Sequence, residues 1–363
     1  MALADGTIIR GKGFGAITKT SGEVVFNTGM VGYPESITDP SYNGQILLQT
    51  YPLIGNYGVF RKHFESNGAK IEGYVIRELS REPSHWTSEL NLSDWLREEG
   101  IPGLEAVDTR MLTKKLRIHG VMLGVLWVFP EENEPSEEEI ASELREIADP
   151  NKMDLVREVA TTQIRHHEIG SRHTIALLDC GVKRNIIQSL TARGLNVIQY
   201  PPDTPAYKIL GDKPDGILIS NGPGDPKMIP YAVETVGALV DSDIPMLGVC
   251  LGIQLLALAS GADTYKLKFG HRGQNHPVID LTTGRCFITS QNHGYAVDSD
   301  SLRGTDLEVS MVNANDRTVE GFKHRKKAIT AVQFHPEASP GPEDTSYLFD
   351  EFSRQVLTKP SRR

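Results

Sequence analysis

The sequence predicts an α/β protein of two domains, a β-rich α/β domain followed by a doubly wound, mainly parallel sheet. Short strand-like runs with many turns fill the first third of the 363 residues, and an acidic segment follows them. After that segment, apolar strands alternate with helical patterns. Such alternation is typical of a doubly wound parallel sheet. We therefore expect domains in residues 1–130 and 172–363, joined by an acidic connector in residues 131–171.

The expected elements of the first domain are short. Its strand-like runs lie in residues 6–15, 22–29, 45–52 and 70–79. Helical patterns cover Leu90–Glu99 and Thr109–His119. In the connector, Ser136 opens the capping pattern Ser-Glu-Glu-Glu, so we expect a short exposed helix over residues 136–148.

The second domain carries longer apolar strands. They lie in residues 173–181, 195–201, 216–220 and 244–250, and a further β-rich run covers residues 328–334. Helical patterns lie in residues 183–193, 229–242 and 251–260. Because ligands bind outside the carboxyl ends of strands in open α/β sheets, the loops after residues 220 and 250 are expected to meet at one crevice.

Composition limits the class of function. A net charge of −9 disfavours a nucleic-acid surface, which needs a cationic patch. The sequence has no apolar run long enough for a membrane span, and its start lacks the pattern of a signal peptide. Its three widely spaced cysteines form neither a disulfide framework nor a C-x-x-C metal site. We expect a cytoplasmic globular protein that binds no metal, nucleic acid or membrane.

Cys250 is the candidate nucleophile. It lies in the run Gly248-Val249-Cys250-Leu251-Gly252, between an apolar strand and an apolar helix. The flanking glycines allow the tight strand-to-helix turn of a nucleophile elbow. Unpaired N–H groups in the first turn of the helix favour a thiolate and stabilise a developing oxyanion. A lone cysteine among apolar residues is usually a small core residue, but the two glycines favour the nucleophile.

A base and an orienting carboxylate follow the last β-rich run. That run delivers His335, then Pro336 and Glu337. Together with Cys250, His335 and Glu337 complete a set of nucleophile, base and orienting group. The alternative for His335 is a loop histidine that precedes a proline turn.

These motifs resemble those of a known class of enzymes. The run GVCLGIQ is similar to the G-x-C-x-G-x-Q elbow of class I, triad-type glutamine amidotransferases, and FHPE resembles their His-Pro-Glu signature. The segment Ser290–Tyr295 (SQNHGY) resembles a glutamine-contacting segment of one branch, the carbamoyl-phosphate synthetase small chain. Phe26–Glu35 (FNTGMVGYPE) and Thr38–Tyr42 (TDPSY) resemble that branch and no other amidotransferase.

The resemblance implies a class I glutamine amidotransferase domain after the connector and a small-chain domain before it. It also implies a set of glutamine contacts. These are Ser41, Gly222, Gly224, Leu251, Gln254, Asn292, Gly294 and Tyr295. The backbone N–H groups of Gly222 and Leu251 are the implied oxyanion hole. The alternatives are a structural turn at residues 221–226 and a turn serine at Ser41, whose implied role puts the glutamine pocket partly at the domain interface.

The resemblance further implies an activity and a partner. Members of this family hydrolyse L-glutamine to glutamate and pass the ammonia to a large subunit, which makes carbamoyl phosphate from bicarbonate and ATP. The chain has no G-x-x-x-x-G-K-[ST] loop, so we expect no cofactor in it, and ATP and Mg are expected on the large subunit. Whether the product supplies arginine synthesis, pyrimidine synthesis or both stays open, as does the assembly of heterodimers into larger complexes.

Two other functions are kept as alternatives. The first is a free-standing cysteine hydrolase of γ-glutamyl peptides, which the small-chain motifs of the first domain disfavour. The second is a non-catalytic glutamine sensor or scaffold, which the intact set of Cys250, His335 and Glu337 disfavours.

Several residues depart from the family pattern or have no assigned role. Ile253 stands where several relatives carry histidine, Tyr295 replaces a commoner phenylalanine, and His293 has no assigned role. Cys180 is expected to be structural, at the end of a strand, and Cys286 is expected in a core strand.

Overall fold

The structure, a computed structural model, describes residues 1–130 and 133–358. The described chain divides into two compact units, one ending at Met153 and the other beginning at Asp154. The expected connector therefore contributes residues to both units. Residues 131–132 of that connector and residues 359–363 of the expected second domain lie outside the described residues.

The first unit is built on a mixed sheet with the strand order β1-β9-β3-β4-β6-β8-β2. Its strands are β1 (Ala2–Leu3), β2 (Lys12–Gly15), β3 (Lys19–Asn27), β4 (Gln45–Gln49), β6 (Gly73–Val75), β8 (Pro102–Glu105) and β9 (Met122–Trp127). The run from β3 through β4 and β6 to β8 is parallel, while β9, β1 and β2 pair antiparallel. The short strands β5 (Leu53–Ile54) and β7 (Glu78–Leu79) form a separate parallel pair.

Side-chain caps fix the starts of two helices in this unit. Asn91 caps α2 (Leu92–Glu98) and Asp108 caps α3 (Thr109–His119), each by accepting a hydrogen bond from a backbone N–H of the first turn. The side chain of Trp95, on α2, is fully buried in the core of the unit. The other short elements are α1 (Tyr33–Thr38), η1 (Pro40–Tyr42), η2 (Arg61–His63) and η4 (Pro150–Lys152).

Helix α4 (Glu137–Glu146) is the helix expected in the connector. Ser136 and Glu139 form a reciprocal capping box at its start. The structure describes this helix in full, and none of its residues is buried. The expectation of a short, exposed, capped helix is confirmed.

The second unit is built on a larger sheet with the strand order β10-β12-β11-β13-β14-β19-β18-β17-β15-β16. Its strands are β10 (Arg165–His167), β11 (Thr174–Leu178), β12 (Asn196–Tyr200), β13 (Gly216–Ile219), β14 (Met246–Val249), β15 (Thr264–Asp280), β16 (Cys286–Val297), β17 (Leu307–Asn313), β18 (Val319–His324) and β19 (Ile329–Val332). From β12 to β19 the neighbours are parallel. β10 and the run from β18 to β16 are antiparallel.

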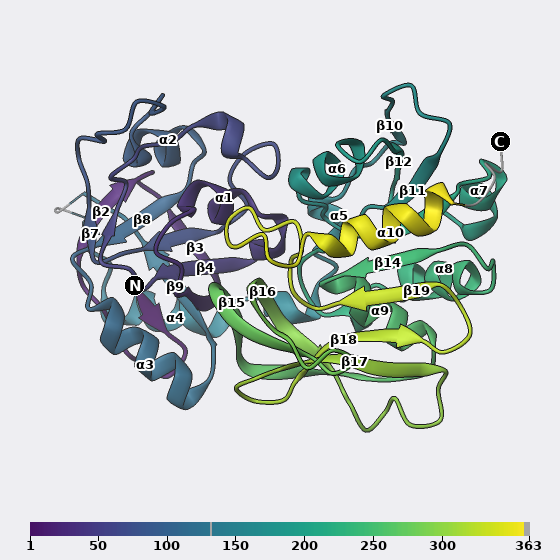
Figure 1. The fold of residues 1–363 in the computed structure, drawn as a ribbon. Coiled ribbons are helices and arrows are strands. Elements are labelled where there is room, and N and C mark those ends of the chain that lie inside the picture. The colour runs from purple at the N-terminus through teal and green to yellow at the C-terminus, as the bar shows by residue number, and fades with distance from the viewer. Residues whose placement is uncertain (131–132, 359–363) are drawn as a thin grey trace. The chain divides into compact units, whose positions relative to one another are not determined.

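Helices cover both faces of the parallel strands (Figure 1). They are α5 (Val156–Val159), α6 (Arg184–Thr191), α7 (Ala206–Gly211), η5 (Pro226–Met228), α8 (Pro230–Val240), α9 (Leu251–Ala259) and α10 (Tyr347–Leu357). On β13, Leu218 packs in the core that contains α6 and α10, whereas Ile217 and Ile219 pack in the core that contains α8 and α9. Burial on both faces is typical of parallel strands, and the expected α/β class is confirmed.

The antiparallel end of this sheet adds one correction. Cys286 was expected in the core, but it is exposed as the first residue of β16. Side chains alternate along a strand, so Phe287 points inward and Cys286 outward. Among the described helices, none combines the length and the apolar character that crossing a bilayer requires.

Candidate active site

Cys250 lies at a strained turn between β14 and α9. Its backbone has φ 55° and ψ −103°, a conformation that residues with side chains rarely adopt. The N–H of Cys250 donates to the carbonyl oxygen of Val332 on β19 at 2.9 Å, so the neighbouring strand holds the turn. Strained backbone of this kind clusters at active sites. The turn has the form expected of a nucleophile elbow.

The start of α9 packs closely on β13 at Gly252. A Cβ atom at Gly252 would lie 2.3 Å from the carbonyl oxygen of Ile219, far inside van der Waals contact. Any residue larger than glycine would push α9 away from the sheet. The glycine of the sequence motif thus has a steric reason in this fold.

His335 and Glu337 follow β19, the strand next to β14. The N–H of His335 donates to the carbonyl oxygen of Ser290 on β16 at 2.9 Å. The ring Nδ1 of His335 lies 2.6 Å from Oε1 of Glu337. Nε2 has no hydrogen-bond partner among the described residues. The carboxylate therefore fixes the ring through Nδ1 and leaves Nε2 for proton transfer.

Neighbouring charges determine the protonation of this pair. Burial alone would lower the pKa of His335, but Glu337 and then Cys250 outweigh it and raise the pKa to about 10. Burial alone would raise the pKa of Glu337, but Lys183 and then His335 lower it to about 2. At neutral pH the site therefore holds an imidazolium beside an ionised carboxylate.

Lys183 is a site residue that the sequence analysis missed. It lies in the turn between β11 and α6, is almost fully buried, and places Nζ 3.1 Å from Oε1 of Glu337. Nζ also donates to the carbonyl oxygen of Ala338 at 2.5 Å. In the first turn of α6, the side-chain amide of Asn185 donates to the carbonyl oxygen of Glu337. The position of Lys183 after a parallel strand was the signal available in the sequence.

The segment Ser290–Tyr295 lies along β16 and passes the nucleophile. The Sγ atom of Cys250 lies 3.6 Å from the carbonyl oxygen of Asn292. The side-chain amide nitrogen of Gln254, on α9, donates to the carbonyl oxygen of Tyr295 at 3.0 Å. The structure therefore brings three predicted site residues, Gln254, Asn292 and Tyr295, beside the elbow, and Gly294 lies between the last two on the same strand.

Gly222 and Leu251 lie side by side, where the loops after β13 and β14 adjoin. A Cβ atom at Gly222 would lie 2.0 Å from the carbonyl oxygen of Cys180 and 2.8 Å from Cδ2 of Leu251. Gly224 follows with φ 83°, a conformation that favours glycine. Gly222 thus lies against the side chain of Leu251, and the role of their backbone N–H groups as an oxyanion hole stays a prediction.

The structure also places Ser41, the predicted glutamine contact outside the second unit. Ser41 belongs to the first unit, in η1, where it is buried and its N–H donates to Oδ1 of Asp39 at 2.9 Å. Its predicted contact with glutamine stays a prediction.

Cys180 is fully buried after β11, its N–H donates to Oγ of Ser220 at 2.9 Å, and burial raises the pKa of its thiol far above the ordinary value. A buried thiol of raised pKa suits the structural role expected of it.

Comparison with known proteins covers both units. The family model described as Carbamoyl-phosphate synthase small chain, CPSase domain, matches residues 1–126. The model described as Glutamine amidotransferase class-I matches residues 176–355.

Relatives called carbamoyl phosphate synthase small chain are similar over almost their full length. The protein from Methanopyrus kandleri is 49% identical over 352 residues, which cover 97% of each chain. The protein from Archaeoglobus fulgidus is 48% identical over 97% of each chain. The protein from Listeria monocytogenes serotype 4b is 49% identical over 99% of this chain and 97% of the relative. The chain therefore belongs to the carbamoyl phosphate synthase small chain family and carries a class I glutamine amidotransferase domain.

Proposed function

We propose that Cys250, His335 and Glu337 hydrolyse L-glutamine in this glutamine-hydrolysing small subunit of carbamoyl phosphate synthase. The observation that carries the proposal is the 2.6 Å contact between Nδ1 of His335 and Oε1 of Glu337, just after the strand that pairs with the strand before the cysteine elbow. Nucleophile, proton carrier and orienting carboxylate come from neighbouring strand ends, as a catalytic triad requires.

In the first half of the reaction, the thiolate of Cys250 attacks the carboxamide carbon of glutamine, and a C–S bond forms. The oxyanion that develops accepts hydrogen bonds from the backbone N–H groups of Gly222 and Leu251. His335 gives its Nε2 proton to the departing nitrogen, the C–N bond breaks, and ammonia leaves. A γ-glutamyl thioester on Cys250 remains.

In the second half, a water molecule attacks the thioester carbon and gives a proton to Nε2 of His335. The C–S bond breaks, glutamate leaves, and Cys250 and His335 return to their starting ion pair. Glu337 holds the ring through Nδ1 in both halves and stabilises its positive form. Lys183 holds Glu337 in turn.

Glutamine specificity is proposed to come from groups around the elbow. Free glutamine carries an α-amino and an α-carboxyl group, which need polar partners at a fixed distance from the carboxamide. The proposed partners are Ser41, Gly224, Gln254, Asn292, Gly294 and Tyr295. The placement of Gln254 and Asn292 beside Cys250 supports their part in this set.

A small chain implies a large chain as its partner. We propose that the ammonia passes to that large subunit, which uses it with bicarbonate and ATP, and that ATP and Mg bind there and not to this chain. The absence of a G-x-x-x-x-G-K-[ST] loop from the sequence supports the second part. The carbamoyl phosphate then supplies arginine synthesis, pyrimidine synthesis or both. We also propose a cytoplasmic location, since Cys180, Cys250 and Cys286 are all free thiols.

Glutamate release by the purified chain tests the proposal, measured with and without the large subunit, ATP and bicarbonate. Strong stimulation by the complete mixture, lost in Cys250→Ser, is the expected result. Equal turnover of glutamine or γ-glutamyl peptides without the partner would instead indicate a free-standing hydrolase. No turnover in any mixture would indicate a sensor or scaffold.

A further inference from the structure

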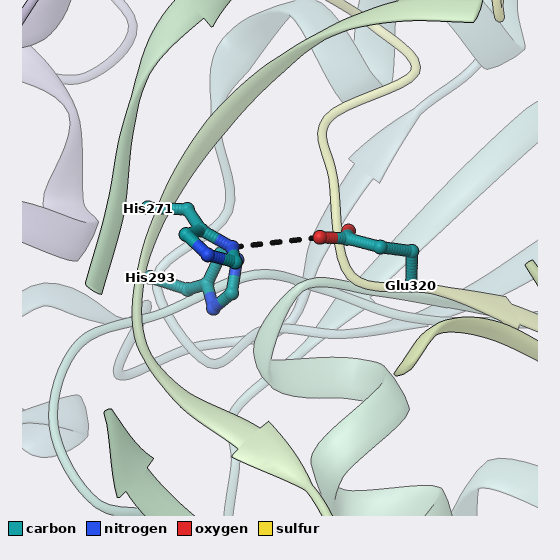
Figure 2. Close-up of side chains that lie close together, drawn as sticks. All are labelled: His271, His293 and Glu320. Carbon is teal, nitrogen blue, oxygen red and sulfur yellow. Dashed lines mark ion pairs between the residues drawn. The ribbon is translucent and has the colours of Figure 1, made fainter. Parts of the chain in front are cut away.

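A cluster of metal-ligating side chains lies in the antiparallel part of the second unit, outside the triad. His271 on β15, His293 on β16 and Glu320 on β18 are all buried. His271 and His293 are direct partners across the strand pair, and their rings meet edge to face with centroids 4.9 Å apart. Figure 2 shows both rings beside the carboxylate of Glu320.

The spacing of the ligand atoms suits one cation. One ring nitrogen of each histidine and one oxygen of Glu320 lie within 4.8 Å of one another. Nδ1 of His271 is 3.5 Å from Oε1 of Glu320 (Figure 2). Ligand atoms of a tetrahedral zinc ion, each about 2.0–2.1 Å from the metal, lie about 3.3 Å apart. A small closing movement of these side chains would bring the three ligand atoms to this spacing and leave the fourth position of the ion open.

Two polar atoms of these ligand side chains lack hydrogen bonds although they are buried. Among the described residues, neither Nδ1 of His271 nor Oε2 of Glu320 has a hydrogen-bond partner. His271 is 6% exposed and Glu320 is fully buried. Buried polar atoms without partners are costly, and a bound ion is one of the few things that satisfies them.

The surrounding contacts are those of an outer shell around a metal. Nε2 of His271 lies 2.8 Å from Oδ2 of Asp316, which directs Nδ1 toward Glu320. The side-chain amide of Asn313 donates to Oε1 of Glu320 at 3.0 Å. Metal-bound histidines usually donate their second N–H to a carboxylate or carbonyl, and metal-bound carboxylates are themselves hydrogen-bonded.

His293 adds a conflict that a cation would resolve. Its Nδ1 lies 2.7 Å from the carbonyl oxygen of Tyr295 and its Nε2 lies 3.0 Å from Oε1 of Gln291. A neutral ring has one N–H, so one of these contacts sets a lone pair against an oxygen. If the Gln291 amide is turned round, its nitrogen can donate to His293, but its oxygen then faces the hydroxyl of Thr289. That hydroxyl already donates to a backbone carbonyl, so the unpaired contact only moves to Thr289.

We infer that His271, His293 and Glu320 bind one divalent transition-metal ion of the zinc type. Neutral imidazoles and a carboxylate suit zinc better than calcium or magnesium, which prefer oxygen ligands. The carboxylates of Glu320 and Asp316 together balance the charge of a divalent ion. No sequence motif marks this site, because its ligands come from three separate strands.

The ion would act as a structural link close to the segment Ser290–Tyr295, which carries proposed glutamine contacts. It would tie β15, β16 and β18 together, and β16 carries Asn292 and Gly294 on either side of His293. The metal site shares no residue with the triad, so its test does not depend on the proposed glutaminase reaction.

A proton is the competitor for the same position. Burial alone would lower the pKa of His271, but the nearby carboxylates of Asp316 and Glu320 outweigh it and raise the pKa to about 9. Zinc must therefore displace a proton from His271, and binding is best measured in mildly alkaline buffer.

The test measures zinc binding by the full chain that carries Cys250→Ser, so that the catalytic thiolate cannot act as a ligand. The protein is stripped with a chelator, dialysed against defined free Zn²⁺ near neutral to mildly alkaline pH, and its metal content is measured. We expect one equivalent of zinc and a rise in the midpoint of thermal unfolding with free Zn²⁺. A stripped parent that takes up no zinc would overturn the inference.

Matched variants separate this site from adventitious binding. Glu320→Gln keeps the size of the side chain and removes the anionic ligand, and we expect it to weaken zinc binding by at least about tenfold. Glu308→Gln, on the exposed surface of β17, is the control and should bind zinc like the parent. His271→Asn is the second ligand variant, with the exposed His166→Asn as its control. Equal zinc affinity in Glu320→Gln and the parent would also overturn the inference.

Discussion

Lys183 and Glu337 form a buried ion pair, with Nζ 3.1 Å from Oε1, and the same carboxylate oxygen lies 2.6 Å from Nδ1 of His335. Both side chains of the pair are almost fully buried. One carboxylate oxygen thus lies between two cations in a buried site. The orientation of the His335 imidazole depends on a lysine from a different strand end.

Lys183→Met is expected to destabilise the chain and slow the reaction. Removal of one partner of a buried pair leaves an uncompensated charge and typically costs about 3–5 kcal/mol. We expect a loss of that order in the free energy of unfolding, a rise in the pKa of Glu337, and a fall in kcat for glutamine hydrolysis. Chemical denaturation and steady-state kinetics measure both effects.

Two further variants control this prediction. Lys152→Met removes an exposed lysine and should leave stability and rate unchanged. The double variant Lys183→Met/Glu337→Gln removes both charges and should regain part of the lost stability. If Lys183→Met is as stable as the parent, the ion pair does not hold Glu337 in the way described here.

Glu337→Ala is expected to be milder than His335→Ala. In the proposed reaction, the carboxylate orients the ring and stabilises its cation, whereas the imidazole carries the proton in both halves. In serine proteases, loss of the orienting acid costs roughly tenfold to a hundredfold less than loss of the histidine. Values of kcat/KM for glutamine in the complex with the large subunit measure the difference. The reverse order of damage would show that the two roles are misassigned.

Gly252→Ala tests the elbow by its steric effect. The added Cβ would lie 2.3 Å from the carbonyl oxygen of Ile219, so α9 and the N–H of Leu251 must move. Loss of one oxyanion donor costs about 10²–10³-fold in kcat, and we expect a decrease in that range. Gly211→Ala is the control, because a Cβ atom there meets no other atom within 4 Å. Unchanged turnover in Gly252→Ala would exclude the N–H of Leu251 from the oxyanion hole.

Stability is expected to depend on pH through His335. Its pKa is raised to about 10 by Glu337 and Cys250 against the effect of burial, so the folded chain holds this proton more tightly than the unfolded chain. The stabilising contribution is therefore complete below a pH of about 6.5, the ordinary pKa of histidine, and is lost as the pH rises through about 10. The difference in free energy of unfolding between the parent and His335→Gln should shrink between these values. A constant difference would contradict a raised pKa.

The triad and the parallel core follow from local sequence signals. The motif Gly248–Gly252 contains both the strand end and the helix start, and α3 begins and ends at the residues that its helical pattern marked, Thr109 and His119. These elements depend on short-range patterns, which the surrounding structure reinforces.

Contacts between residues from distant segments could not be predicted from the sequence patterns. In the sequence alone, Lys183 has the pattern of a surface lysine. Its contact with Glu337 becomes visible only in the fold, which brings the segments after β11 and β19 together. β15 has shifts of register between Lys266 and His271 and between Gly273 and His276, so the alternation that marks a strand is broken and its pairing with β16 was not predicted. For the same reason His293, which faces His271 across this pair, had no assigned role.

The most direct test of the central claim compares two nitrogen sources in the complex of the parent or Cys250→Ser chain with the large subunit. If Cys250 only supplies ammonia, Cys250→Ser should lower glutamine-dependent synthesis of carbamoyl phosphate by about 10³-fold or more. Synthesis from added ammonium should stay at the level of the parent complex. Equal loss with glutamine and with ammonium would contradict the assignment of Cys250 as the glutaminase nucleophile.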